Sequence, residues 1–229
     1  MSKILAFKLP EQLSLESYAY FTAQVTEERR ARLARFFHKE DAYRSLFGEI
    51  LVRYILCSQL GQRNGNIQFE ENAFGKPGVS GLPDFEYNVS HSGDWVLMIW
   101  GMNEGSLGVD IEQIRPIDIQ IAERFFSVEE REALQAKSAG ERQDFFYDLW
   151  TLKESYIKAI GTGLSRPLDS FTVQQREDGN FGLITEAESM YLQTYTIAPD
   201  YKAAACSSCC TLPETATFIK LSELYRSLY

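Results

Sequence analysis

The sequence predicts an α+β fold with two comparable halves, residues 1–104 and 105–229, that form one compact unit. Short apolar segments bounded by turn residues predict strands in both halves. Each half also contains one long segment whose apolar residues have helical spacing, which predicts a long helix. A glycine, Gly61 in the first half and Gly161 in the second, follows each of these segments. A length of 229 residues and an apolar content of 45% suit one large domain or two small ones. The break is predicted near Asn103 to Ser106.

The first half is predicted to begin with a strand near Ile4 to Leu9, where apolar and polar residues alternate. Two helices follow. The longer one runs from about Glu40 to Leu60, and Gly61 ends it because glycine readily adopts the left-handed conformation found at helix ends. Strands are then predicted at 67–70, 85–89 and 95–100, and the polar segment Ser90 to Gly93 is predicted to be the loop between the last two.

The second half repeats this order of elements, although no residue-by-residue repeat is visible. It opens with a strand at 106–112, and Ser127 and Glu130 have the spacing of a capping box that starts a helix. A longer helix is predicted from about Arg142 to Ile160. Asp178-Gly179 is typical of a hairpin turn. Strands are predicted near 171–174, 181–184, 191–197 and 201–206.

Charge and the N-terminal residues limit the classes of partner. The formal net charge of −9 argues against general nucleic-acid binding. The first ten residues contain no long hydrophobic run, so neither a signal peptide nor a membrane span is expected, and the cytoplasm is the predicted location. Four cysteines do not make a disulfide framework in a chain of this size, and Cys206-x-x-Cys209 lacks the second Cys/His pair of a zinc site. Reduced thiols are expected.

Three carboxylates and a lysine form the most informative group. Asp110 and Glu112 are two apart in a predicted strand and therefore project from one face, whereas Glu154 and Lys158 are four apart on a predicted helix. Carboxylate oxygens without histidine or thiolate suit a hard cation such as Mg²⁺, which often also binds substrate phosphates. The alternative is a solvated strand face and an ordinary surface ion pair.

Two further segments contain groups that suit phosphate binding. Ser90, His91 and Ser92 place hydroxyls and an imidazole beside Gly93, although a hairpin without function often has the same composition. The segment from Thr26 to Arg44 contains six basic and four acidic residues, and Arg29 and Arg32 lie on one side of a predicted helix. A solvated helix face is the alternative for this segment.

Several separated motifs together resemble the phosphopantetheinyl transferases of the surfactin-synthetase-activating (Sfp) type. The resemblance covers most of the chain, from about Ile4 to the strand around Ala203, and fades in the last twenty or so residues. It is carried by Gly-Val-Asp-Ile-Glu (108–112), Trp-Thr-Leu-Lys-Glu-Ser-Tyr-Ile-Lys (150–158), Asn-Val-Ser-His-Ser (88–92), Phe-Phe-His-Lys-Glu-Asp-Ala (36–42) with Arg44, Phe-Gly-Lys-Pro (74–77) and Arg-Phe-Phe-Ser (124–127).

The resemblance implies a pseudo-twofold axis between the two halves, with the active site in the cleft between them. It assigns Asp110, Glu112 and Glu154 to Mg²⁺, and it assigns Lys158 to the pyrophosphate of coenzyme A together with Ser90 and His91. His91, Arg29, Arg32 and Ser45 are implied to hold the nucleoside phosphate, and Lys76 to line the adenine pocket. Well-known members carry Lys, Lys and Thr where this chain has Arg29, Arg32 and Ser45, and a guanidinium binds phosphate with a different geometry.

The implied activity is transfer of the 4'-phosphopantetheine arm of coenzyme A to a serine of apo carrier proteins, with release of adenosine 3',5'-bisphosphate. The implied partners are peptidyl carriers, with acyl or aryl carriers as well, of nonribosomal peptide or polyketide synthases. Glu154 and Lys158 are the implied catalytic residues, and a monomer without membrane or nucleic-acid partners is expected. Two alternatives remain, a non-catalytic carrier-binding module and a Mg²⁺-dependent nucleotide phosphohydrolase.

Overall fold

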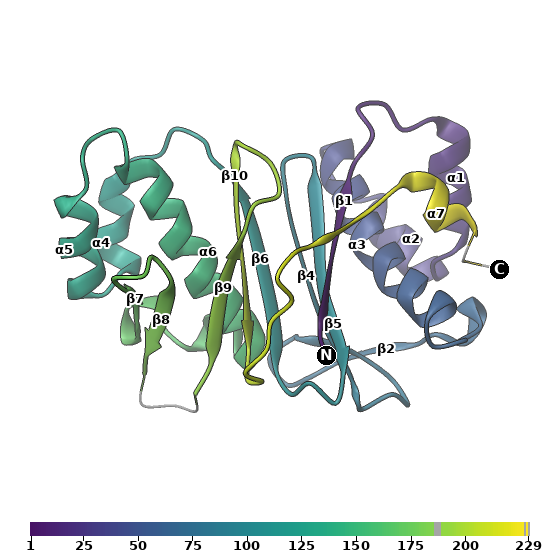
Figure 1. Cartoon of the computed structure of the whole chain (residues 1–229). Helices are drawn as coiled ribbons and strands as arrows, with labels where there is room; N and C mark the ends of the chain where they lie inside the picture. The colour runs from purple at the N-terminus through teal and green to yellow at the C-terminus, as the bar shows by residue number, and fades with distance from the viewer. Residues whose placement is uncertain (186–188, 227, 229) are drawn as a thin grey trace.

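Two main β-sheets stand side by side between two groups of helices in the computed structural model, which describes residues 1–185, 189–226 and 228 (Figure 1). The elements up to residue 102 are β1 (Lys3–Lys8), α1 (Leu15–Ala23), α2 (Glu27–Leu33), α3 (Lys39–Ser58), β2 (Phe69–Glu71), β3 (Pro77–Val79), β4 (Phe85–Ser92) and β5 (Trp95–Met102). Those that follow are β6 (Leu107–Gln113), α4 (Ala122–Phe125), α5 (Val128–Ala136), α6 (Arg142–Ile160), β7 (Thr172–Gln175), β8 (Phe181–Ile184), β9 (Tyr191–Tyr195), β10 (Tyr201–Ser207), β11 (Thr217–Ile219) and α7 (Leu221–Arg226). Short 3₁₀ turns occupy 64–66, 119–121, 163–165 and 168–170.

The first sheet has the order β11-β1-β5-β4 and the second the order β6-β10-β9, with β2-β3 and β7-β8 as separate pairs. Helix α3 packs its buried face on one sheet, and α6 packs on the other. A third cluster joins the two sheets, because alternate side chains of β1 and β5 meet those of β6 and β10. Each half therefore has a sheet with a long helix on its outer face, which confirms the predicted α+β class with two similar halves.

The two long helices lie close to where the sequence predicted them. Helix α6 spans Arg142–Ile160, as predicted, and Gly161 ends it with a φ of 66°. Helix α3 ends at Ser58, two residues before the predicted end. The capping box at the start of α5 is also confirmed, because the side chains of Ser127 and Glu130 each accept a backbone N–H of the other residue.

The prediction of a loop over residues 90–93 was wrong for its first three residues. Ser90, His91 and Ser92 continue strand β4 and pair with β5, so that only Gly93 and Asp94 form the turn. Gly93 has a φ of 53°, and a Cβ there would lie 2.1 Å from the hydroxyl of Tyr201. The polar residues that suggested a loop instead project from an ordered strand.

The C-terminal segment packs with the first half. Strand β11 pairs in parallel with β1, and α7 contributes Leu224 to the same core as α3. Neither element was predicted from the sequence. The division at residues 104 and 105 stays a prediction, to which the structure adds that the chain returns to the first sheet after residue 216.

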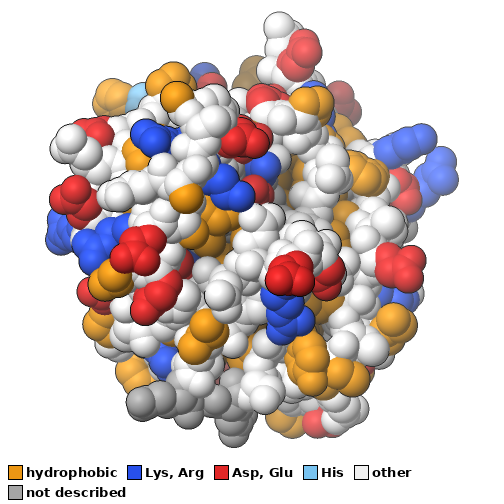
Figure 2. Space-filling view, turned by 60° about the vertical axis from the view of Figure 1, so that its left-hand side comes forward, with side chains coloured by type: hydrophobic (Ala, Val, Ile, Leu, Met, Phe, Trp, Pro, Cys, Tyr) orange, Lys and Arg blue, Asp and Glu red, His pale blue; other side chains and the backbone are white. Residues whose placement is uncertain are grey.

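Charges of both signs lie on the face of the molecule drawn in Figure 2. Figure 2 shows acidic, basic and apolar side chains interspersed on the face that it presents. No helix among the described residues is both long and apolar enough to cross a membrane. The four cysteines are all free, and burial in β10 raises the pKa of the Cys206 thiol to about 12, which makes that thiol a poor nucleophile and metal ligand at neutral pH.

A fully buried ion pair connects α5 to α6. The Lys153 Nζ lies 2.6 Å from Glu130 Oε1 and donates to the carbonyl of Phe171 at 2.8 Å. Both charged side chains have a relative exposure of 0%. Glu130 also accepts the N–H groups of Ser127 and Val173, so the carboxylate is saturated with hydrogen bonds. Such a pair tolerates burial because its partners replace water.

Glu130→Ala is expected to lower the free energy of unfolding by about 3–5 kcal/mol, because the ammonium of Lys153 would be left buried without its counter-charge. Urea unfolding followed by circular dichroism measures this loss. Glu132→Ala on the same helix is the matched control, since Glu132 is exposed and its removal should change stability by less than about 0.5 kcal/mol. Equal stability of the two variants would contradict a structural role for the pair.

Candidate functional site

Helix α6 and strand β6 approach each other closely at Gly108. A Cβ at this position would lie 2.0 Å from the carbonyl oxygen of Ser155 and 2.4 Å from the backbone nitrogen of Ala159. Only glycine allows the helix to lie so near the strand. The consequence is that Lys158 of α6 comes beside Asp110, two residues after Gly108, and that Glu154 lies within electrostatic range of Asp110.

Asp110 is the centre of the resulting cluster. Its side chain has a relative exposure of 4%, and its Oδ1 accepts hydrogen bonds from Lys158 Nζ at 2.6 Å and from Ser90 Oγ at 2.7 Å. Lys158 also donates to Ser90 Oγ at 2.9 Å. The other oxygen, Asp110 Oδ2, is buried and has no hydrogen-bond partner among the described residues. A buried carboxylate oxygen without a donor is costly and indicates a missing partner.

The other two carboxylates lie within electrostatic range of Asp110. The pKa of Glu112 is raised by burial first and then by the charge of Asp110, while the hydrogen bond from Ser92 opposes the shift. The pKa of Glu154 is likewise raised by burial and then by Asp110, with Lys158 acting in the opposite direction. Asp110 therefore raises the pKa of both glutamates, and this repulsion between carboxylates would be relieved by a bound cation.

The donor chemistry of this cluster fits a hard cation. All candidate ligands are carboxylate oxygens, and Asp110 Oδ2 is buried without a donor among the described residues. Within the part of the chain that the structure describes, however, no three His, Cys, Asp or Glu side chains are grouped closely enough to hold a metal ion. Two of the carboxylates instead accept hydrogen bonds from Lys158 and Ser92. A metal-binding role for Asp110, Glu112 and Glu154 stays a prediction.

Strand β4 forms the opposite wall of the site. Every second side chain, from Asn88, Ser90 and Ser92, accepts a backbone N–H of β6. From the sequence, Ser90 and Ser92 were considered only as phosphate-binding groups and Asn88 had no predicted role, so these side-chain contacts with β6 were not predicted. The signal that would have identified them is the period of two in Asn-Val-Ser-His-Ser, which places the three polar side chains on one face of a strand.

Arg29 and Ser45 are brought together, but they bind each other. The Arg29 Nη2 donates to the hydroxyl and to the carbonyl of Ser45 at 2.9 and 2.8 Å, and its Nε lies 2.9 Å from Glu49 Oε2. Burial lowers the pKa of Arg29, Glu49 opposes this shift, and the positive charge of Arg32 adds to the lowering. Arg32 is exposed on α2. The two arginines are therefore close enough to present positive charge together.

Lys76 lies at a junction of the two halves. Its Nζ pairs with Glu86 and donates to the carbonyls of Leu107 and Ala159 at 3.2 and 3.0 Å. These contacts connect the β2-β3 hairpin to the start of β6 and the last turn of α6. The structure therefore gives Lys76 three partners within the protein, and its predicted place in an adenine pocket stays a prediction.

His91 lies on β4 between Ser90 and Ser92 and is exposed. Arg44, which belongs to the same sequence motif as Phe36 to Ala42, donates to the carbonyl of Gly93 at 2.7 Å and pairs with Asp41. This contact joins α3 to the turn that follows β4 and holds the end of that strand near the basic segment of the first half.

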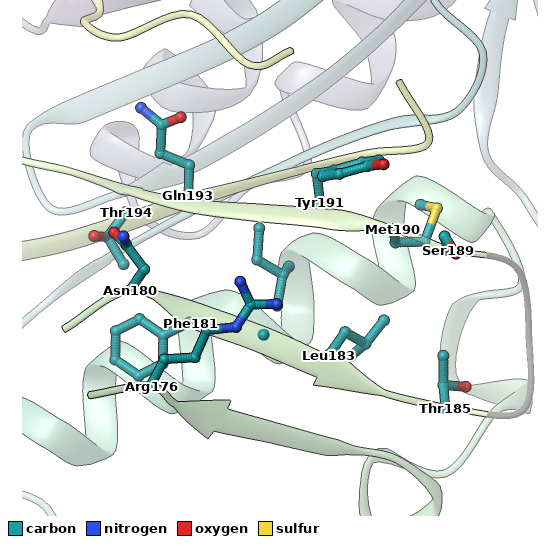
Figure 3. A pocket seen from close by; sticks show the side chains of 12 residues that line it. Arg176, Asn180, Phe181, Leu183, Thr185, Ser189, Met190, Tyr191, Gln193 and Thr194 are labelled. Atoms are coloured by element: carbon teal, nitrogen blue, oxygen red, sulfur yellow. The ribbon is translucent and has the colours of Figure 1, made fainter. Parts of the chain in front are cut away.

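A cavity of about 800 Å³ lies away from this cluster, between strands β8 and β9 (Figure 3). Its wall includes Arg176, Phe181, Tyr191 and Gln193, and it contains none of the predicted site residues. The candidate site is therefore defined by its charged groups and not by this cavity.

Two family models match the chain. Residues 106–206 match the 4'-phosphopantetheinyl transferase superfamily, and residues 12–101 match the N-terminal domain of 4'-phosphopantetheinyl transferase. Among solved structures, a holo-(acyl-carrier-protein) synthase from Bacillus anthracis in complex with CoA (3',5'-ADP) is 23% identical with a TM-score of 0.41, and the match covers 44% of this chain and 93% of that chain.

Curated relatives match almost the whole length. The 4'-phosphopantetheinyl transferase Sfp of Bacillus subtilis is 41% identical over 97% of this chain and 99% of its own. The 4'-phosphopantetheinyl transferase gsp of Aneurinibacillus migulanus is 35% identical over 98% and 92%. These matches confirm the predicted resemblance, and the chain belongs to the 4'-phosphopantetheinyl transferase superfamily as an Sfp-like member.

Proposed function

We propose that this chain transfers the 4'-phosphopantetheine arm of coenzyme A to a serine of apo carrier proteins. The observation that carries the proposal is the convergence of Asp110, Glu154 and Lys158 at the contact of α6 with β6, in a chain that is 41% identical to Sfp over nearly its whole length. The products are the holo carrier and adenosine 3',5'-bisphosphate. Peptidyl carriers, together with acyl or aryl carriers, of nonribosomal peptide and polyketide synthases are the proposed partners.

Asp110, Glu112 and Glu154 are the residues that would hold Mg²⁺. The buried oxygen Asp110 Oδ2 and the mutual repulsion of the carboxylates support this assignment. When bound, the ion neutralises charge on pyrophosphate oxygens during transfer of the phosphoryl group.

Side chains of the protein accept the serine proton and stabilise the leaving group. The carrier serine oxygen attacks the phosphorus bonded to pantetheine, and the bond from this phosphorus to the bridging oxygen of the pyrophosphate breaks. The raised pKa of Glu154 makes its carboxylate a better acceptor for the serine proton. Lys158, which reaches between β4 and β6, supplies positive charge to the departing phosphate.

The nucleoside phosphate of coenzyme A is assigned to the basic segment of the first half. Arg32 is exposed and shares its electrostatic environment with Arg29, which Glu49 and Ser45 hold in place. His91 and Ser45 complete this proposed group, and Ser90 contacts the pyrophosphate together with Lys158. Lys76 would line the adenine pocket while it bridges the two halves. A cytoplasmic monomer without membrane or nucleic-acid partners also belongs to the proposal.

The transfer is tested by intact-protein mass spectrometry of an apo peptidyl carrier incubated with this protein, coenzyme A and Mg²⁺. The carrier should gain the mass of one phosphopantetheine arm, and a chelator should abolish the gain because the carboxylates need their counter-ion. No gain on peptidyl, polyketide and fatty-acid carriers alike would favour a non-catalytic carrier-binding module. Cleavage of coenzyme A without any carrier would favour a nucleotide phosphohydrolase.

Asp110→Ala and Glu154→Gln should each lower the rate of transfer by roughly a hundredfold or more, since both remove a charge from the reacting centre. The same mass-spectrometric assay under initial-rate conditions measures the effect, and circular dichroism checks that the variants stay folded. Near-normal turnover of either variant at ordinary Mg²⁺ would reject this site.

Arg32→Ala should raise the KM for coenzyme A by about tenfold, equivalent to about 1.4 kcal/mol, and change the maximal rate much less. The reason is that Arg32 is assigned to a remote phosphate that does not react. Arg35→Ala is the matched control because Arg35 is also exposed and basic but has no assigned contact. An equal KM for both variants would remove Arg32 from the binding site.

A further inference from the structure

The two sheets meet along β4 and β6, and side chains take the place of a backbone ladder there. Asn88 Oδ1 accepts the N–H of Val109 at 3.0 Å, Ser90 Oγ that of Ile111 at 3.4 Å, and Ser92 Oγ that of Gln113 at 3.1 Å. The two strands belong to different sheets. Because the partners advance together by two residues, the strands run parallel in a fixed register.

Two rungs of this ladder also bind the carboxylates of the candidate site. Ser90 Oγ donates to Asp110 Oδ1 at 2.7 Å, and Ser92 Oγ donates to Glu112 Oε2 at the same distance. A hydroxyl has one proton to donate and lone pairs to accept with. Each serine can therefore hold a carboxylate and the next backbone N–H of β6 at the same time.

Each of the two carboxylates has a second oxygen that the serine does not use. Asp110 Oδ1 takes the hydrogen bonds from Ser90 and Lys158, while Oδ2 is buried and has no hydrogen-bond partner in the part of the chain that the structure describes. Glu112 Oε2 takes the hydrogen bond from Ser92, and no hydrogen bond or ion pair between described residues uses Oε1. Each carboxylate is thus held by one oxygen and free to bind a ligand with the other.

Ser92 differs from Ser90 in one respect. Ser90 also accepts a hydrogen bond from the ammonium of Lys158 and is assigned to coenzyme A. Among the described residues, the hydroxyl of Ser92 forms hydrogen bonds only with Glu112 and Gln113. We propose that Ser92 is a positioning residue, which orients the carboxylate of Glu112 for the metal ion and locks the end of β6 against β4.

The role given to Ser92 rests on the proposed function, in which Glu112 holds the metal. Loss of a side chain that orients a metal ligand typically weakens metal binding by about 10–100-fold. Ser92→Ala should therefore bind the ion about tenfold more weakly, while coenzyme A binding through the basic segment is retained. Ser92→Thr keeps the hydroxyl and should restore affinity, whereas Ser92→Val, of nearly the same shape, should not.

The experiment is a titration with Mn²⁺ at saturating coenzyme A and without a carrier, followed by the electron paramagnetic resonance signal of free Mn²⁺. Ser80→Ala is the matched control, because Ser80 Oγ also donates to a glutamate, Glu70 Oε2 at 2.9 Å, but Ser80 follows β3 and Glu70 lies on β2, in a separate strand pair. In the transfer assay, the Mg²⁺ concentration for half-maximal rate should rise about tenfold in Ser92→Ala, with less than a twofold change in the KM for coenzyme A.

The outcomes separate a failure of the positioning role of Ser92 from a failure of the proposed metal site. If wild-type protein binds Mn²⁺ and all Ser92 variants bind it equally well, the positioning role is wrong and the proposed function stands. If wild-type protein binds no Mn²⁺ at saturating coenzyme A, the metal assignment itself fails, and the role of Ser92 with it. Should Ser92→Ala unfold, the Thr and Val variants still isolate the hydroxyl, because both side chains suit a strand.

Discussion

The contact of helix α6 with strand β6 at Gly108 is the constraint on which the candidate site depends. A side chain at this position would overlap the backbone of Ser155 and Ala159, so any larger residue would push the helix away from the sheet. Lys158 would then lose its reach to Asp110 and Ser90, which lie on two different sheets. The absence of a Cβ at Gly108 therefore determines whether the charged and polar side chains of α6, β6 and β4 can contact one another.

The site is also a junction between the two halves. Strands β4 and β6 are edges of separate sheets, and their contact is made by Asn88, Ser90 and Ser92 in place of backbone pairing. Lys76 ties the same halves together at the other end of β6 through the carbonyls of Leu107 and Ala159. The polar groups that surround the carboxylates therefore contribute to folding as well as to the proposed chemistry, because each satisfies a backbone group that would otherwise be buried without a partner.

Prediction from the sequence succeeded where the signal is local. The bounds of α6 and the capping box of Ser127 with Glu130 follow from periodicity and spacing within a few turns of helix. It failed where a contact between distant segments overrides the local preference. Ser90 to Ser92 resemble a loop in composition but remain in β4, because pairing with β5 satisfies their backbone and β6 satisfies their side chains. Strand β11 was not predicted, because residues 217–219 become a strand by pairing with β1, which lies about two hundred residues away in sequence.

The sequence by itself determined the fold class and the family, and it supplied the candidate site residues as predictions, since periodicity and short motifs are properties of neighbouring residues. Only the tertiary structure decided which of those residues meet. It joined Asp110 to Lys158 and Ser90, engaged Arg29 with Glu49 and Ser45, placed Lys76 between the halves, and revealed Ser92 beside Glu112. The physical reason is that hydrogen bonds and ion pairs act over a few ångströms in space, and packing of the two sheets sets those distances independently of separation along the chain.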